Sequence, residues 1–180
     1  MVEVLRTIMD EVEDVIGKVK EEELDAMVNK LDPSKRVFVA GEGRSGLSAK
    51  GFAMRLMHLG YTVFVVGETI TPAVQENDVF IGVSGSGTSA NVVNDTKKAA
   101  EKGCVVIAVT SKPESPLAQL AETILVIPGT VKGDAGQGRK SVQLLSSLFD
   151  QSLHITLDAV CLLVSKKNGT ANDAATKAHW

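Results

Sequence analysis

Two short loops rich in glycine and serine are the part of the sequence best suited to hold an anion. The first reads Gly-Glu-Gly-Arg-Ser-Gly at 41–46, and the second reads Ser-Gly-Ser-Gly-Thr-Ser at 84–89. Glycine lets backbone N–H groups approach a charged oxygen closely, and serine and threonine add hydroxyl donors. If each loop leads into a helix, the positive end of the helix dipole adds to the attraction. The two loops therefore predict a site for a phosphate group.

The first loop also fits the G-x-G-x-x-G pattern of a dinucleotide site, so a nicotinamide-dependent dehydrogenase remains a rival function. Such a site uses an acidic residue about 20 positions later to bind the ribose, and the candidate here, Glu68, comes too late and follows a glycine. The second loop of the same kind favours a small phosphorylated ligand instead. Structural roles stay open as well, since the first loop can be a tight turn and Ser84, Ser86 and Ser89 can cap the next helix.

Short apolar runs alternate with helical patterns from residue 36 onward, which predicts an α/β protein. Strands that are apolar throughout are typical of a parallel sheet with helices on both faces. We expect a three-layer sandwich with a five-stranded parallel sheet in the flavodoxin-like order 2-1-3-4-5. In that order both glycine-serine loops lie at the switch point where ligands bind. The strands are predicted at 36–41, 62–66, 79–83, 105–110 and 123–127, and the helices between them at 45–59, 90–102 and 116–121.

The chain of 180 residues has the size of a single domain. We divide it into N-terminal helices within 1–31, a sheet core at 36–128, a C-terminal helix at 141–165 and a tail at 166–180. The stretch 129–140 contains four glycines, which predicts a long mobile loop with a functional role. The tail ends in a histidine and a tryptophan, which suggests that it docks on the protein.

Composition narrows the possible partners. A net charge of −3 with scattered lysines and arginines argues against nucleic-acid binding. The absence of a long apolar run and of a secretory signal predicts a cytoplasmic protein with no membrane partner. Cys104 and Cys161 each lie in an apolar run, so we expect buried thiols and no disulfide. The three histidines lack metal-ligand spacing, so no metal is expected.

Six motifs, spread over almost the whole chain, resemble those of a known family. They are VFVAGEGRSG at 37–46, FAMRLMHLG at 52–60, GETITP at 67–72, SGSG at 84–87, PESPL at 113–117 and SLFDQ at 147–151. The sequence resembles the sugar isomerase (SIS) domain family and, within it, the 6-phospho-3-hexuloisomerases. The SGSG motif is common to SIS domains, whereas its combination with FAMRLMHLG and GETITP is more specific.

The resemblance implies a SIS sandwich, usually tetrameric, that works without a cofactor. It implies the interconversion of D-arabino-3-hexulose 6-phosphate and D-fructose 6-phosphate, a step of formaldehyde assimilation in the ribulose monophosphate pathway. The phosphate is expected on Ser84, Ser86 and Ser89, with Ser45 reaching in from the first loop. The candidate substrate-binding residues are Arg44, Ser45, Glu68, Ser84, Gly85, Ser86, Gly87, Thr88 and Ser89.

Moving a carbonyl between neighbouring carbons requires a group that takes a proton from one carbon and returns it to the other through a 2,3-enediol. The family uses the glutamate of S-L-F-E-Q as this base, and Asp150 stands in its place here, one methylene shorter. Without the resemblance, Asp150 is equally well explained as an acid at a helix N-terminus. His154 lies on the same helical face and can pair with it or simply pack.

His179 is the candidate general acid by resemblance, because the family ends in a histidine-containing tail that folds over an active site, often a neighbour's. Arg44 and Glu68 can bind substrate or pair with each other. His58 is expected in the core or at a subunit interface, and apolar side chains at 52–59 and 2–19 predict self-association. The alternative function is a SIS-type sensor that binds a sugar phosphate without chemistry.

Overall fold

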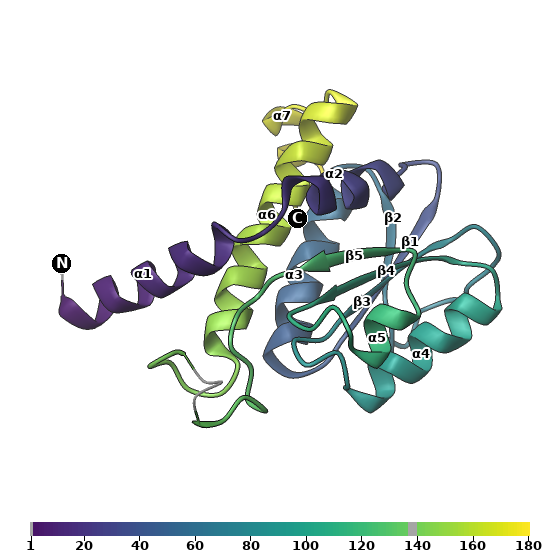
Figure 1. The fold of residues 1–180 in the computed structure, drawn as a ribbon. Helices are drawn as coiled ribbons and strands as arrows, with labels where there is room; N and C mark the ends of the chain where they lie inside the picture. The colour runs from purple at the N-terminus through teal and green to yellow at the C-terminus, as the bar shows by residue number, and fades with distance from the viewer. Residues whose placement is uncertain (1, 137–139) are drawn as a thin grey trace.

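The computed structural model describes residues 2–136 and 140–180, and its centre is a five-stranded parallel sheet (Figure 1). The strand order is β2-β1-β3-β4-β5, which confirms the expected α/β sandwich. Each strand is a short apolar run, and β3 at the centre is buried along its whole length. The strands are β1 (Arg36–Gly41), β2 (Thr62–Val65), β3 (Val79–Val83), β4 (Val105–Thr110) and β5 (Thr123–Val126).

The register of the sheet brings the two glycine-serine loops together. β1 and β3 are hydrogen-bonded neighbours, and Gly41 at the end of β1 is opposite Val83 at the end of β3. The loop 41–46 and the loop 84–89 therefore leave the same edge of the sheet side by side. This edge is the switch point expected for the strand order.

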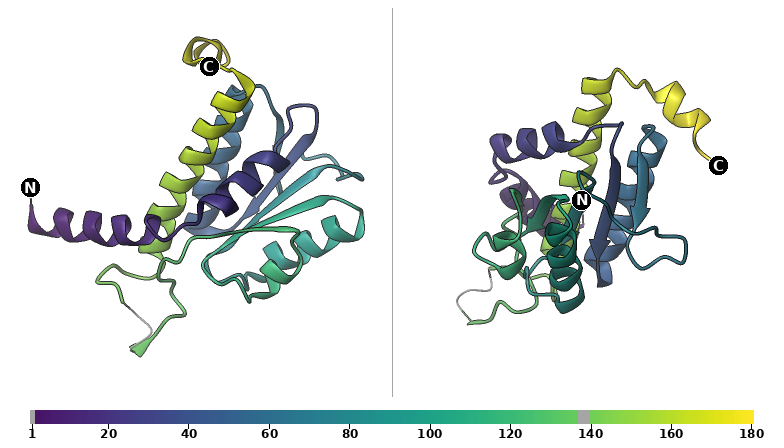
Figure 2. Two further views of the ribbon diagram at one scale, coloured as in Figure 1. Left: turned by 45° about the horizontal axis from the view of Figure 1, so that its top comes forward. Right: turned by 90° about the vertical axis from the view of Figure 1, so that its right-hand side faces the viewer.

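Helices cover both faces of the sheet (Figures 1 and 2). The larger core cluster joins one sheet face to α2, α3 and α6, with α2 against β5 and α1 against α6, while α4 and α5 pack on the other face. In both figures α1 extends away from the sheet. The helices are α1 (Glu3–Ile16), α2 (Glu21–Lys30), α3 (Gly43–His58), α4 (Ala90–Glu101), α5 (Pro116–Gln119), α6 (Ser147–Asn168) and α7 (Asn172–Lys177).

The long C-terminal helix, α6, differs from the predicted span of 141–165. It begins six residues later, at Ser147, because Leu145 has a left-handed backbone (φ 53°) that a helix cannot accommodate. It continues past 165 to Asn168 and ends at Gly169, which adopts the left-handed C-cap conformation. By length and composition alone α6 could cross a bilayer, yet over half of its apolar window is buried in the fold, as expected of a core helix.

The stretch 129–140 is only partly described, because 137–139 lie outside the described residues. Its first half is packed: Thr130 and Val131 are buried, and the N–H of Val131 donates to Asp134. These two buried residues anchor the start of the stretch, whereas Lys132 and Gly133 are exposed, and the mobility of the loop stays a prediction. The docking expected of the tail is confirmed for His179, whose ring lies 5.2 Å from that of His58, and not for Trp180, which is fully exposed. The burial predicted for both cysteines and for His58 is confirmed.

Candidate active site

A pocket of about 510 Å³ opens at the carboxyl edge of the sheet, where the two glycine-serine loops meet. Three walls come from segments far apart in the sequence: the first turn of α3, the loop after β3, and the segment before α6. Val131 and Lys132 add a fourth wall from the loop after β5. Asp150 completes the lining from the first turn of α6.

The first loop is a tight turn and also a wall of the pocket. A side chain on Gly46 would lie 2.6 Å from the carbonyl oxygen of Gly41, so only glycine lets α3 start this close to β1. Gly43 has a left-handed backbone (φ 58°) that turns the chain into the helix. The first-turn residues Gly43, Arg44 and Ser45 line the pocket, where N–H groups at a helix start attract anions.

The second loop forms a cup of hydroxyl groups that bond to one another. The Oγ atoms of Ser84 and Ser89 are 2.9 Å apart, and the Oγ of Ser86 lies 2.8 Å from the Oγ1 of Thr88. The N–H groups of Gly87 and Thr88 donate to Ser84 and Ser86 within the same loop. A hydroxyl both donates and accepts, so it can exchange one of these partners for a phosphate oxygen.

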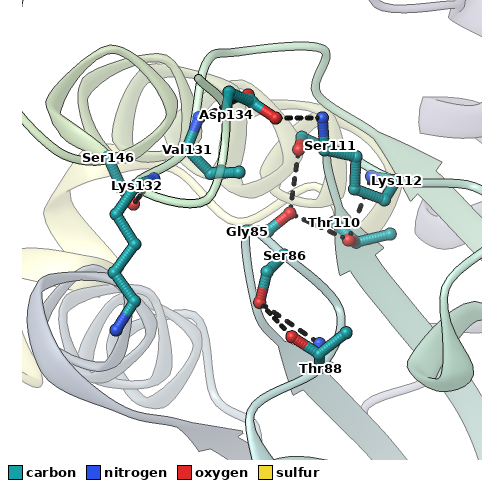
Figure 3. Close-up of polar contacts among 10 residues, drawn as sticks. All are labelled: Gly85, Ser86, Thr88, Thr110, Ser111, Lys112, Val131, Lys132, Asp134 and Ser146. Atoms are coloured by element: carbon teal, nitrogen blue, oxygen red, sulfur yellow. Dashed lines mark hydrogen bonds and ion pairs between the residues drawn. The ribbon is translucent and has the colours of Figure 1, made fainter. Parts of the chain in front are cut away.

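Close packing fixes the shape of this cup. A side chain on Gly85 would lie 2.8 Å from Val131 and 2.9 Å from Phe149, which brings the loop after β5 and α6 against it. The carbonyl oxygen of Gly85 accepts hydrogen bonds from the hydroxyls of Thr110 and Ser111 (Figure 3). Ser84, Gly85, Ser86 and Ser89 line the pocket, while Gly87 and Thr88, which were also expected there, do not line it and instead bond to Ser84 and Ser86.

Asp150 is a buried carboxyl group that faces this cup from the opposite wall. Its side chain is about 6% exposed, and its Oδ1 accepts a hydrogen bond of 2.6 Å from the Oγ of Ser45. Burial raises the pKa of Asp150, while the hydrogen bond from Ser45 and the charge of Arg44 oppose that rise. A carboxylate whose pKa lies closer to neutral is a better general base than an exposed one.

Arg44 serves Asp150 and the start of α6. Its Nη1 donates to the Oγ of Ser147 over 2.9 Å, and its Nε is 3.9 Å from Asp150. The alternative pairing of Arg44 with Glu68 is wrong. Glu68 instead lies 3.9 Å from Lys50 in a separate hollow, because β2 is the edge strand and its following turn leads away from the switch point. The structure therefore does not bring Glu68 to the pocket.

Both candidate histidines lie away from the pocket of their own chain. The ring of His179 contacts that of His58, with centroids 5.2 Å apart, at the opposite end of α3 from the pocket. A helix of 16 residues spans about 24 Å, so His179 cannot reach the substrate pocket of the same chain. His154 is exposed and lies 3.7 Å from Asp158, one turn further along α6. It shares a second, shallower hollow with Asp150, and the contacts of the described residues show no bond between the two.

Sequence reasoning missed several pocket residues. Glu42 lines the pocket and accepts a hydrogen bond of 2.6 Å from Asn91, and Ser146 and Ser147 line it ahead of α6. Lys132 is the most informative omission, because it brings a cation to the cup. Its position after the fifth strand could have indicated this, because the carboxyl ends of parallel strands lie at the same edge of the sheet. Within 2–136 and 140–180, no cluster of histidine, cysteine and acidic side chains could hold a metal ion.

Comparison with known proteins supplies a family context for this pocket. Residues 30–155 match the family model described as SIS domain. The 3-hexulose-6-phosphate isomerase of Bacillus subtilis is 36% identical over 177 residues, covering 98% of this chain and 96% of that one. The enzyme of the same name from Mycobacterium gastri is 43% identical over 156 residues, covering 87% and 78%.

A solved structure extends the similarity to the fold. The crystal structure of a hypothetical protein from Methanococcus jannaschii, which infers the function of a 3-hexulose-6-phosphate isomerase, superposes with a TM-score of 0.82. The two chains are 27% identical, and the match covers 99% of this chain and 98% of that one. The similarity thus includes the pocket-forming loops and both ends of the fold.

Proposed function

The chain belongs to the SIS domain family, and we propose that it is a 3-hexulose-6-phosphate isomerase that interconverts D-arabino-3-hexulose 6-phosphate and D-fructose 6-phosphate. Relatives with that name share 32–43% of their residues with it over most of its length. The observation that carries the proposal is the buried carboxyl group of Asp150, which shares one pocket with the hydroxyl cup at 84–89.

The cup is the proposed phosphate site. Ser84, Ser86 and Ser89 donate hydroxyl hydrogens to the phosphate oxygens, and the first turn of α3 faces the same space. Hydrogen bonds to a charged group contribute about 1.5–3 kcal/mol each, so a few of them support micromolar binding. With the phosphate fixed there, the reacting carbons of the sugar lie toward Asp150.

Asp150 is the proposed base for both halves of the reaction. Starting from fructose 6-phosphate, its carboxylate takes the proton from C3, the electron pair of that C–H bond forms the C2=C3 double bond, and the C2 carbonyl oxygen receives a proton. The 3-hydroxyl of this enediol then loses its proton and becomes the new carbonyl group, while Asp150 returns its proton to C2. Arg44 stabilises the negative charge that develops on the oxygens, while Ser45 holds the carboxylate of Asp150 in place. Protons and electrons balance over these two steps without a cofactor.

We further propose a cytoplasmic homotetramer in which His179 serves the pocket of a neighbouring subunit as general acid. Exposed apolar side chains on the outer faces of α3 and α6, among them Leu47, Met54, Ile155 and Leu162, supply a surface for self-association. Mixing inactive Asp150→Asn and His179→Ala proteins should restore part of the activity in hybrid oligomers. Mixtures that stay inactive would remove His179 from this role.

The isomerase proposal is tested by direct conversion of fructose 6-phosphate by the parent protein and by Asp150→Asn. We expect turnover by the parent and a loss of about 100-fold or more in the variant, because general-base catalysis contributes about 100- to 10,000-fold. Tight binding of fructose 6-phosphate without turnover would favour the sensor function instead. Binding of NADH, which we do not expect, would support the alternative function of a nicotinamide-dependent dehydrogenase.

A further inference from the structure

We propose that Lys132 is a specificity-determining residue that supplies the positive charge for the substrate's phosphate group. The inference rests on the proposed function and adds a binding residue that the sequence motifs do not include. Lys132 lies in the pocket wall formed by the loop after β5, beside the cup at 84–89.

The charges of the pocket leave Lys132 as the available cation. The carboxylate of Glu42 accepts a hydrogen bond from Asn91, and Asp150 is held by Ser45. Arg44 is held at the Asp150 end of the pocket, where it donates to Ser147 and serves the reacting oxygens of the sugar. Among residues 2–136 and 140–180, the ammonium group of Lys132 makes no hydrogen bond or ion pair. A phosphate dianion entering a pocket with two acidic side chains therefore meets one uncommitted positive charge.

Contacts of its backbone and of neighbouring residues hold Lys132 in place. Because these contacts do not involve its side chain, the ammonium group is free to bind a ligand. The N–H of Lys132 donates to the Oγ of Ser146 over 3.0 Å. The N–H of Val131 donates to Asp134, whose other oxygen lies 2.8 Å from the Nζ of Lys112. Val131 is buried against Gly85 of the cup. The loop is therefore attached to the phosphate site through main-chain and neighbouring side-chain contacts, none of which uses the Lys132 side chain.

The direction of the side chain agrees with this role. In Figure 3 Lys132 extends from the loop beside the cup that carries Ser86 and Thr88, and its Nζ is at the free end, away from the Lys112–Asp134 pair. A lysine ammonium on a flexible stem is a point charge that can follow a phosphate group. The hydroxyls of the cup are neutral donors, so they contribute less than Lys132 to preferring a phosphorylated sugar over the free sugar.

Substitution of the Lys132 side chain separates an effect on substrate binding from an effect on the chemical step. In Lys132→Gln we expect KM for fructose 6-phosphate to rise about 10- to 100-fold, with kcat changed less than threefold, because the loss of one charged hydrogen bond acts on binding. Lys132→Arg, which keeps the charge, should recover most of the affinity. Lys140→Gln is the matched control, since Lys140 is exposed further along the same connection and lines a different hollow. KM unchanged in Lys132→Gln, or raised equally in Lys140→Gln, would overturn the proposal.

Inorganic phosphate tests the charge without reference to the reaction. For the same rise in melting temperature, Lys132→Gln should need about tenfold more phosphate than the parent or Lys140→Gln, and added salt should weaken that difference. Equal protection of all three proteins would contradict the role of Lys132. If the parent binds phosphate through Lys132 but does not isomerise fructose 6-phosphate, the proposed function fails while this inference stands.

Discussion

Ser45 donates a hydrogen bond of 2.6 Å to the carboxylate of Asp150, although the two residues are 105 positions apart in the chain. Ser45 lies in the first turn of α3 and Asp150 in the first turn of α6, so the contact joins the N-terminal ends of two neighbouring helices. Arg44 adds a second contact across the same junction. The bond fixes the direction of a buried carboxylate toward the pocket, and it makes the pKa of Asp150 depend on α3.

The hydrogen bond between Ser45 and Asp150 should affect the acid limb of the pH profile of kcat/KM. The base must be ionised, so kcat/KM should fall as the pH drops through the pKa of Asp150, which burial raises above the ordinary aspartate value of 3.8. Ser45→Ala removes a contribution that lowers this pKa, so the limb should move to higher pH. Thr88→Ala removes a hydroxyl from the cup without touching Asp150 and should leave the limb in place. A limb that moves to lower pH in Ser45→Ala would contradict the assignment of Asp150 as base.

Lengthening the base tests whether its reach limits the rate. Asp150→Glu places the carboxylate one methylene further into the pocket, as in the family motif S-L-F-E-Q. Misplacement by about 1 Å can cost on the order of 100-fold in rate, so we expect kcat to equal or exceed that of the parent. Steady-state assays of both proteins decide the point. A kcat for Asp150→Glu as low as that of Asp150→Asn would contradict this expectation. It would show that the pocket requires the carboxylate at the position that the aspartate side chain gives it.

Gly87 should be the least replaceable glycine of the cup. Its backbone is left-handed (φ 65°), and an added side chain would lie 2.0 Å from the Oγ of Ser115. Gly87→Ala should lower the free energy of unfolding by on the order of 3 kcal/mol, through backbone strain together with this overlap. Gly43→Ala is the matched control, because Gly43 has a similar φ (58°) with open space around it, and about 1 kcal/mol is expected. Urea unfolding measures both, and equal losses would refute the packing argument.

Glu11 on α1 should act as a positioning residue for the pocket wall at 144–147. Its Oε1 accepts the N–H of Val142, and its Oε2 accepts bonds from the side chains of Ser141 and Gln143. Gln143 in turn accepts a bond of 2.6 Å from Gln151, the residue after Asp150.

Glu11→Gln replaces one accepting oxygen by a donor. We expect a loss of about 1–3 kcal/mol of stability and a drop of several degrees in melting temperature, together with a higher KM. Glu13→Gln, an exposed change on the same helix, should alter neither quantity. The positioning role would be lost if the two variants behaved alike.

The sheet and the meeting of the two loops could be predicted from the sequence because both depend on local signals. Each strand is an apolar run bounded by polar residues or glycine, and its predicted limits agree with the structure to within one residue. The strand order then follows from the rules for parallel sheets, which place the loops after β1 and β3 together. Asp150 reaches this edge because α6 packs along α3. Its place in the site could be predicted only from the family motif S-L-F-E-Q.

Other features depend on tertiary contacts that no local pattern records. The start of α6 was placed too early, because the apolar residues before Ser147 continue a helical pattern until Leu145 turns the chain and Glu11 holds 141–143. Glu68 was assigned to the site by its place after a strand, yet that strand is the sheet edge. The place of Lys132 after the fifth strand predicts this sheet edge, but its closeness to the cup depends on the packing of Val131 against Gly85.

Hydrogen exchange at the sugar carbon tests the central role of Asp150 most directly. Fructose 6-phosphate is incubated in D₂O with the parent protein or with Asp150→Asn, and its C3 hydrogen is followed by proton NMR. An enediol formed by Asp150 predicts deuterium at C3 with the parent protein and exchange at least 100-fold slower with the variant. Exchange at equal rates in both proteins would contradict Asp150 as the group that moves the proton.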